Sequence, residues 1–405
     1  MKSTPSLVLF VVTASFFLLP FAHALDWPQW RGINRDGISS EKISPASWGK
    51  DGPKQLWRKE VGTGVSSVVV RGGHLYTMGN KGGTDVVFCL DASTGAEIWR
   101  HTYSQGVEAR QYEGGPAGTP TVDGDRVYTL SHEGDLFCLS AASGKVLWSK
   151  NLQRDFGGIR QKWGYSGSPL VDGNLVILDA GGPGASTVAL DKNTGAVKWK
   201  AGSDGAGYSS PVAFDLGGVR SVVIFKADAL VGLSSANGQE LWRYPWQTKY
   251  DVNAPTPIVS DNKIFITSGY GTGCALVQVG PGKVTEIWRN KNLRSQLASP
   301  VLVQGYIYGI DGNVGGGELR CLDFGSGEVK WRQNIGGGTL IAAGGYLLVL
   351  SERGELIVVE ASPTNYREVA RAQVLGGHCW VTPAVADGKI YCKNNQGSLV
   401  CLAGN

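Results

Sequence analysis

Seven tryptophans recur along the chain at nearly constant spacing, and this periodicity constrains the fold more than any other feature. Successive members are 42 to 51 residues apart, and Val369 occupies the corresponding place of an eighth copy 38 residues later. A period of roughly 40 to 50 residues is typical of a propeller blade or of a repeat built from helix pairs. The series comprises Trp57, Trp99, Trp148, Trp199, Trp242, Trp288 and Trp331.

The sequence inside each unit decides between these two architectures. Residues 118–148 read GTPTVDGDRVYTLSHEGDLFCLSAASGKVLW, in which short β-branched and aromatic runs are separated by the turn sequences DGD, HEGD and ASG. No stretch shows the 3.6-residue apolar period of a helix. Because this pattern occurs eight times, we predict an all-β, eight-bladed β-propeller of four-stranded antiparallel blades. The predicted blade cores span 66–100, 118–149, 167–200, 209–243, 255–289, 298–332, 338–371 and 382–405.

The two ends of the repeat array predict how the ring closes. The last copy lacks its outer strand, whereas the first repeat element is an isolated outer strand, KQLWR at 54–58. We expect this N-terminal strand to join the last blade, which removes the exposed edges of an open array. In the recurring corner CLDASTGAEIWR, Asp91 and Gly95 are expected to form a tight turn. The seven tryptophans are expected to dock between neighbouring blades.

The N-terminus indicates the location of the protein, and the charge indicates which partners it can bind. An apolar run over 7–21 follows Lys2 and is followed by AHA at 22–24, which predicts a secretory signal peptide over 1–24. Residues 25–53 then form a lead segment. The net charge is +4 without a long basic run, which argues against a nucleic-acid partner. We expect an exported monomer, periplasmic or extracellular, with no transmembrane segment after cleavage.

The cysteines and histidines do not form a recognisable metal or disulfide pattern. An odd set of seven cysteines leaves at least one thiol free unless it pairs with another chain. Four occupy equivalent repeat positions, too far apart to bond, and are expected in the core: Cys89, Cys138, Cys321 and Cys401. Cys392 and Cys401 lie on a predicted hairpin and are the one pair to test. The mature histidines lack metal-ligand spacing, so no metal site is expected: His74, His101, His132 and His378.

The loops that enter each blade's first strand are the predicted functional region. In a propeller they surround one mouth of the central channel, and here they are long and rich in aromatic and charged residues. Loops on a rigid scaffold usually carry binding, and Tyr, Trp and Arg dominate interface energetics. The alternative is that these side chains only pack the mouth. The predicted binding residues are Arg110, Tyr112, Glu113, Trp163, Tyr165, Tyr208, Tyr250, Asp251, Asn253, Gln296 and Trp380.

The repeated corner, LDxxTGxxxW, resembles the tryptophan-docking repeat of the pyrroloquinoline quinone (PQQ) propeller superfamily over residues 53–405. That superfamily contains quinoprotein dehydrogenases and a non-catalytic branch typified by the outer-membrane assembly lipoprotein BamB. The dehydrogenases use adjacent cysteines, a calcium ion and an Asp base. This chain has no Cys-Cys pair, and none of its residues matches those roles one by one. The resemblance therefore implies the non-catalytic branch, without catalytic residues or a bound cofactor.

Three functions remain open from the sequence. The first is a scaffold of the envelope that binds a protein partner or another ligand at the mouth. The second is a small PQQ-dependent alcohol or sugar dehydrogenase with calcium, in which Trp163 or Trp380 stacks on the quinone and Asp251 or Glu113 is the base. The third is a carbohydrate-binding propeller, because aromatic platforms with Asp and Asn suit sugar faces.

Overall fold

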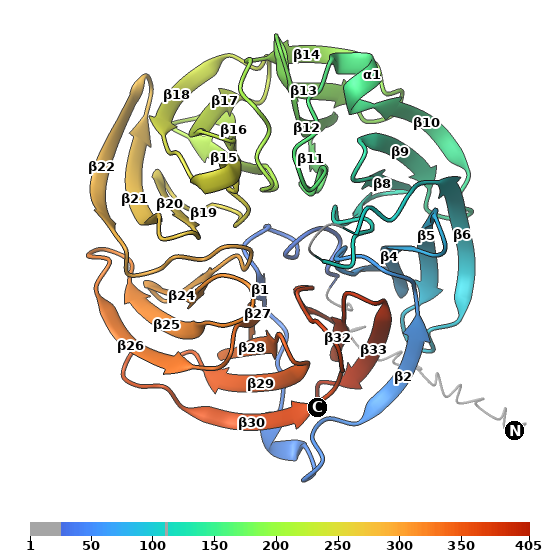
Figure 1. Cartoon of the computed structure of the whole chain (residues 1–405), viewed down its shortest axis with the longest axis vertical. Coiled ribbons are helices and arrows are strands. Elements are labelled where there is room, and N and C mark those ends of the chain that lie inside the picture. Colours follow the sequence, from blue (N-terminus) through green and yellow to red (C-terminus); the bar gives the residue numbers. More distant parts are fainter. Residues whose placement is uncertain (1–25, 110–111) are drawn as a thin grey trace, which may run out of the picture.

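The computed structural model describes residues 26–109 and 112–405 and contains eight sheets arranged as blades around a central channel (Figure 1). Every blade has four antiparallel strands, which confirms the predicted eight-bladed propeller. The predicted signal peptide and Arg110 lie outside the described residues. None of the helices within the described ranges has the length and apolar character needed to span a bilayer.

The blades follow one another in chain order. The first four are β3 (Val69–Arg71), β4 (His74–Asn80), β5 (Thr84–Asp91), β6 (Glu97–Ser104); β7 (Thr121–Asp123), β8 (Arg126–Leu130), β9 (Asp135–Ser140), β10 (Val146–Asn151); β11 (Leu170–Asp172), β12 (Leu175–Gly182), β13 (Ala185–Asp191), β14 (Val197–Ala201); and β15 (Val212–Leu216), β16 (Val219–Phe225), β17 (Ala229–Ser234), β18 (Glu240–Pro245). A short helix, α1 (Leu152–Phe156), follows β10.

The remaining blades are β19 (Ile258–Ser260), β20 (Lys263–Ser268), β21 (Gly273–Gly280), β22 (Lys283–Asn290); β23 (Val301–Val303), β24 (Tyr306–Asp311), β25 (Glu318–Asp323), β26 (Val329–Asn334); β27 (Gly338–Ala343), β28 (Tyr346–Ser351), β29 (Glu355–Glu360), β30 (Glu368–Gln373); and β31 (Ala384–Ala386), β32 (Lys389–Lys393), β33 (Ser398–Ala403). The last blade takes its fourth strand, β2 (Gln55–Glu60), from the N-terminal end. Trp57 lies opposite Cys401, so the predicted ring closure is confirmed.

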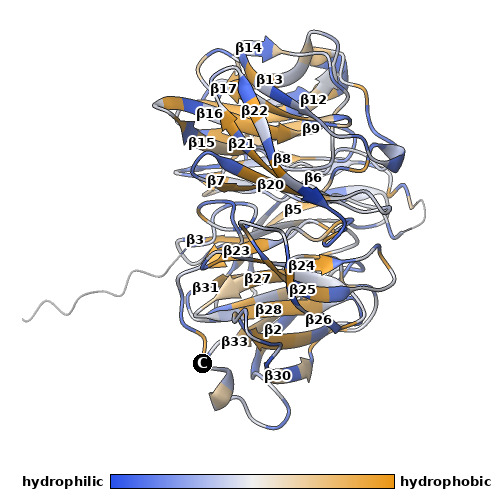
Figure 2. Ribbon diagram, turned by 90° about the vertical axis from the view of Figure 1, so that its left-hand side faces the viewer, coloured by the Kyte–Doolittle hydropathy of each residue, from blue (hydrophilic) through white to orange (hydrophobic). Residues whose placement is uncertain are grey.

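The hydrophobic pattern of each strand follows its place in the blade. The third strand β5 is buried on both faces at all six of its inner positions, because neighbouring blades cover it. The outer strand β6 instead alternates between buried or half-buried and exposed side chains. Figure 2 accordingly shows apolar strand interiors with polar residues toward the loops and edges. The core therefore lies between the blades.

The repeated corner docks each blade onto the next one along the chain. The indole Nε1 of Trp99 donates to the Ala141 carbonyl at 2.8 Å, and the ring covers Gly144, whose φ is +69°. Six tryptophans donate in this way to the following blade: Trp57, Trp99, Trp148, Trp199, Trp288 and Trp331. The Trp242 Nε1 finds no acceptor among the described residues. The corresponding corner of the next blade, between β21 and β22, carries Pro281 and Gly282 instead of the repeated motif.

The structure corrects one position of the repeat and answers the open question of the Cys392–Cys401 pair. Strand pairing places Ala370, not Val369, at the eighth tryptophan position: Ala370 lies opposite Val358 beside the β-bulge, as Trp99 lies opposite Cys89 beside the equivalent bulge. All seven cysteines are buried free thiols. In the β32–β33 hairpin Cys392 lies opposite Val400, which directs it and Cys401 to opposite faces, so this pair forms no disulfide.

The lead segment crosses the channel at the end opposite the first-strand entry loops, visible as the blue trace through the centre of Figure 1. Its β1 (Ile38–Ser39) pairs in parallel with Ala342 and Ala343 of β27, an addition that the sequence did not predict. Arg31 is buried and donates to the carbonyls of Ser299 at 2.8 Å and of Pro300 at 2.5 Å. The segment thus covers one end of the channel, and the entry loops surround the other end.

Candidate ligand-binding mouth

The open end of the channel is built from two sets of loops. Each blade's first strand begins there, and its second strand returns there, so the loops before the first strand and between the second and third strands share this end. Hydroxyls in the entry loops fix their spacing around the channel. Thr119 Oγ1 accepts from Ser67 N at 3.0 Å, and Ser168 Oγ accepts from Thr119 N at 2.9 Å. These hydrogen bonds therefore connect neighbouring blades beneath the loops.

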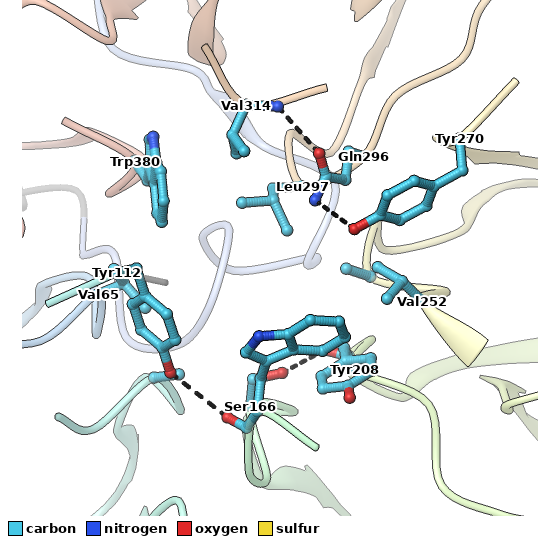
Figure 3. A pocket seen from close by; sticks show the side chains of 13 residues that line it. Val65, Tyr112, Ser166, Tyr208, Val252, Tyr270, Gln296, Leu297, Val314 and Trp380 are labelled. Carbon is cyan, nitrogen blue, oxygen red and sulfur yellow. Dashed lines mark hydrogen bonds between the residues drawn. The ribbon is translucent and has the colours of Figure 1, made fainter. Parts of the chain in front are cut away.

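A pocket of about 210 Å³ opens at this end, and we call it the mouth (Figure 3). Its walls are mainly apolar and aromatic, as in most sites that take organic ligands. Seven of the eight blades contribute through their entry loops. The lining residues are Val65, Tyr112, Ala117, Trp163, Ser166, Tyr208, Val252, Ala254, Tyr270, Gln296, Leu297, Val314 and Trp380.

The structure brings most of the predicted binding residues to the mouth. Five line it directly: Tyr112, Trp163, Tyr208, Gln296 and Trp380. Tyr250 stands beside it, 53% exposed, with its ring 6.4 Å from that of Trp163, and the exposed Asp251 follows. Glu113 lies at the rim, where its Oε1 is 2.7 Å from His378 Nδ1. That these residues bind a ligand stays a prediction.

Two predicted binding residues belong to the core instead. Tyr165 is 2% exposed and donates through its hydroxyl to the Ala180 carbonyl at 3.1 Å. Asn253 is fully buried and donates from Nδ2 to the carbonyls of Lys226 at 2.9 Å and Ala227 at 3.0 Å. Both side chains hold the mouth loops onto the blades, so neither is available to a ligand.

Aromatic rings form two groups that face each other across the mouth. Trp163 lies 6.0 Å from Tyr208, and Tyr250 lies 5.5 Å from Tyr270 in a T-shaped contact. On the other side, Trp380 stacks on His378 and lies 6.1 Å from Tyr112. These residues are half-buried or exposed, so part of each ring remains accessible to solvent. Pairs of this kind are stable at such separations without filling a core.

Polar contacts fix the orientation of the lining side chains. Gln296 donates from Nε2 to the Tyr270 hydroxyl at 3.0 Å and accepts on Oε1 from Val314 N at 2.9 Å (Figure 3). The Ser166 hydroxyl donates to the Tyr208 carbonyl at 2.9 Å. Burial raises the pKa of Tyr208 to about 12, so this phenol stays neutral at physiological pH. The mouth is thus rigid and carries few polar groups.

Three residues at the mouth have left-handed backbone conformations that favour glycine. The φ angles are +65° at Tyr250, +58° at Asp251 and +54° at Tyr270. Each costs about 1–3 kcal/mol for a residue with a side chain, and such conformations cluster at ligand clamps and active sites. Tyr270 lines the pocket, and Tyr250 and Asp251 stand beside it, which supports a binding role.

Sequence reasoning did not identify several lining residues. Tyr270 and Val314 come from loops between second and third strands, and only the entry loops were considered. The strand order itself carried the signal, since antiparallel strands return every second loop to the same end. Val65, Ala117 and Ala254 were missed because small apolar residues carry no chemical pattern.

The carboxylates at the rim of the mouth do not gather into a cluster. In the part of the chain that the structure describes, no group of three or more His, Cys, Asp or Glu side chains could hold a metal ion. Calcium takes six to eight oxygen ligands. The rim carboxylates are engaged separately, Glu113 with His378, Asn395 and Gln396, and Glu352 with the Gly315 N–H at 2.8 Å.

Comparison with known proteins gives one family. A family model described as "Outer membrane protein assembly factor BamB" matches residues 47–116, 109–333 and 315–404. The curated protein of that name from Moranella endobia (strain PCIT) is 27% identical over 193 residues, which is 44% of this chain and 47% of that protein. This chain therefore spans about half the length of that relative.

Solved structures show the same fold. BamB from Moraxella catarrhalis aligns with a TM-score of 0.63 at 17% identity, covering 86% of this chain and 97% of that one. Quinohemoprotein alcohol dehydrogenase from Comamonas testosteroni aligns with a TM-score of 0.65 at 17% identity, covering 94% of this chain and 80% of that one. At this identity both likenesses concern the fold alone.

Proposed function

This chain belongs to the family described as outer membrane protein assembly factor BamB, and we propose that it is an exported, non-catalytic propeller that binds a protein partner at the mouth, in the assembly of envelope proteins. The observation that carries the proposal is the mouth itself, a pocket of about 210 Å³ walled by half-exposed aromatic rings. Exposed aromatic side chains on rigid loops are the usual anchors of protein interfaces.

The charged groups around the mouth favour binding over redox chemistry. A quinone site of the dehydrogenase type requires a calcium ion beside an acidic base, and the described carboxylates do not converge on one point. Burial opposes ionisation of Glu113, yet hydrogen bonds from Asn395 and His378 lower its pKa. A carboxylate with a lowered pKa is a poor general base at neutral pH. We therefore propose that the protein needs no cofactor.

A site-specific photocrosslinker tests where the partner binds. Benzoylphenylalanine replaces Leu297, which lines the mouth and is 37% exposed, or Ile98, which is 45% exposed on the outer strand β6. After irradiation of intact envelopes, mass spectrometry identifies the crosslinked proteins. We expect a specific adduct from position 297 and none from position 98.

The double variant Trp163→Ala/Trp380→Ala, carrying the crosslinker at position 297, supplies the second arm. Truncation of one interface anchor typically costs about 2 kcal/mol or more, equivalent to about thirtyfold in affinity, so the adduct should be lost while the melting temperature changes little. If the adduct persists, or if the double variant loses several kcal/mol of stability with unchanged adducts, the rings pack the mouth and the proposal is wrong.

A further inference from the structure

Two consecutive residues at the rim of the mouth, Tyr250 and Asp251, have left-handed backbone conformations, with φ angles of +65° and +58°. Residues with a side chain disfavour these angles, because Cβ approaches the following carbonyl oxygen, and they normally adopt them singly. A strained conformation of this kind persists only where the surrounding structure enforces it. The contacts of the loop formed by residues 248–253 must therefore supply that constraint.

Asn253 ends this loop, and its fully buried side chain hydrogen-bonds to three separate segments of the chain. Its Nδ2 donates to the carbonyls of Lys226 at 2.9 Å and Ala227 at 3.0 Å, which follow the second strand of the fourth blade. Its Oδ1 accepts from Ser268 Oγ at 2.7 Å and from Thr248 Oγ1. Donors and acceptor of the amide are thus all in use, which fixes its orientation.

These contacts join both ends of the loop to one point of the fifth blade. Ser268, the last residue of β20, also accepts through its hydroxyl from Trp246 Nε1 at 3.0 Å. Within the loop, Asp251 N donates to the Thr248 carbonyl at 3.1 Å, and Asn253 N donates to the Asp251 carbonyl at 3.1 Å. The loop is therefore closed at its base, which leaves the left-handed residues little freedom to relax.

The conformation of this loop determines the shape of one wall of the mouth. Val252, next to Asn253, lines the pocket, and the Asn253 carbonyl accepts from Tyr208 N at 3.1 Å. The Tyr250 ring lies 6.4 Å from the Trp163 ring in a T-shaped contact. If the loop relaxed, the Tyr250 ring would no longer meet Trp163 in this way.

We infer that Asn253 is a positioning residue of the mouth: its buried amide holds Tyr250 and Asp251 in their left-handed conformations and thereby places the Tyr250 ring beside Trp163. This inference rests on the proposed function and names a residue that acts on the partner without touching it. The apparent affinity of a site falls with the fraction of molecules in the binding conformation. Without the amide, the strain in two successive residues favours other conformations of the loop.

Asn253→Ala tests the inference in the full chain labelled with fluorotryptophan, in which Trp163→Phe assigns the fluorine resonance of Trp163. We expect this resonance to shift or broaden, because the Tyr250 ring leaves its place, and the crosslink at position 297 to fall about tenfold. A melting curve shows that the variant is folded at the temperature of both measurements. Thr248→Val removes one hydrogen bond of Asn253 at nearly constant side-chain shape, and should give a smaller change in the same direction if Asn253→Ala does not fold.

Glycine substitutions separate positioning from a general contribution to stability. Glycine adopts positive φ without strain, so adding Asp251→Gly to Asn253→Ala should restore part of the Trp163 signal and part of the crosslink. Asp261 is the matched control, because it is also exposed and has a φ of +52°, but lies in the turn between β19 and β20 at the other end of the blade. Adding Asp261→Gly relieves the same kind of strain there and should restore neither signal.

Three results would overturn the inference. They are an unchanged Trp163 resonance in folded Asn253→Ala, equal recovery with the two glycine substitutions, and no recovery in a folded Asn253→Ala/Asp251→Gly variant. A different result concerns the proposed function alone. If the resonance changes and recovers as expected but no crosslink forms at position 297 even in the wild type, the proposed function fails, while Asn253 still sets the conformation of the mouth.

Discussion

The indole Nε1 of Trp57 donates a hydrogen bond of 3.1 Å to the carbonyl of Ala92, which joins the strand that completes the last blade to the corner of the first. The same ring lies over Gly95, where an added Cβ would be 2.8 Å from Trp57 Cδ2. Gly95 has a φ of +71°. Two separate constraints, backbone conformation and ring contact, therefore require glycine at this position.

Replacing Gly95 by alanine should destabilise the protein more than replacing Gly72. Both glycines have positive φ, so both variants incur about 1–2 kcal/mol of backbone strain. Only at Gly95 does the new methyl group meet the tryptophan, because no atom lies within 4 Å of a Cβ at Gly72. We expect an additional loss of about 1–3 kcal/mol at Gly95, measured by urea unfolding. Equal losses would show that the ring contact is unimportant.

The closing strand should tolerate changes on one face only. Trp57 is 8% exposed, whereas its neighbour Leu56 is 40% exposed. Trp57→Ala should cost about 3–5 kcal/mol, typical for truncation of a large buried side chain, and Leu56→Ala should cost less than about 1 kcal/mol. Thermal melts compare the two. A small loss for Trp57→Ala would mean that ring closure contributes little to stability.

Two neighbouring aromatic residues in one entry loop should respond in opposite ways. Trp163→Ala should reduce partner crosslinking with little change in stability, because its ring is only half-buried. Tyr165→Phe should leave crosslinking unchanged and cost about 1–3 kcal/mol, because the Ala180 carbonyl loses its buried donor. Denaturant unfolding and the position-297 crosslink are measured on both variants. The opposite pattern would reassign the two side chains.

The repeat was readable from the sequence because its residues have direct geometric consequences. The spacing of Trp57 to Trp331 predicted the number of blades, and the isolated strand at 54–58 predicted the closure. At the mouth, however, Trp163 and Tyr165 are two aromatic residues of one entry loop, and the sequence pattern does not distinguish them. The Tyr165 hydroxyl reaches the Ala180 carbonyl on β12. This tertiary contact cannot be predicted from the two-residue spacing of Trp163 and Tyr165.

The contacts of the lead segment could not be predicted from the sequence, for a different reason. Nothing in the sequence marks Arg31 and Arg35 as buried, since buried arginines normally need carboxylate partners. Here the partners are backbone carbonyls around the channel, and carbonyls carry no sequence signature. Likewise, β1 has only two residues and joins β27 through main-chain contacts.

Stability should depend on pH through Asp85, a fully buried carboxyl that accepts from Asn80 Nδ2 at 2.7 Å. Burial raises its pKa to about 6, above the value of about 3.9 in unfolded chains. The folded state therefore binds the proton more tightly. This contribution is fully present below pH 4 and is lost as the pH rises through 6.

Comparison with Asp85→Asn isolates this effect. The stability difference between wild type and the variant should shift against the wild type by about 1–3 kcal/mol between pH 4 and pH 7. Urea unfolding at half-unit intervals measures it, and a difference that does not vary with pH would show that Asp85 keeps an ordinary pKa.

The pairing of β2 with β33 also has a consequence for the order of synthesis. Residues 55–60 leave the ribosome before any other blade strand, yet their partner at 398–403 is made more than three hundred residues later. Throughout that interval the first strand has no neighbour and the last blade cannot exist. A chain that stops early keeps an unpaired strand at its beginning and an open edge at its end, both of which proteases and chaperones recognise. The β2–β33 pairing can therefore form only after residues 398–403 have been synthesised.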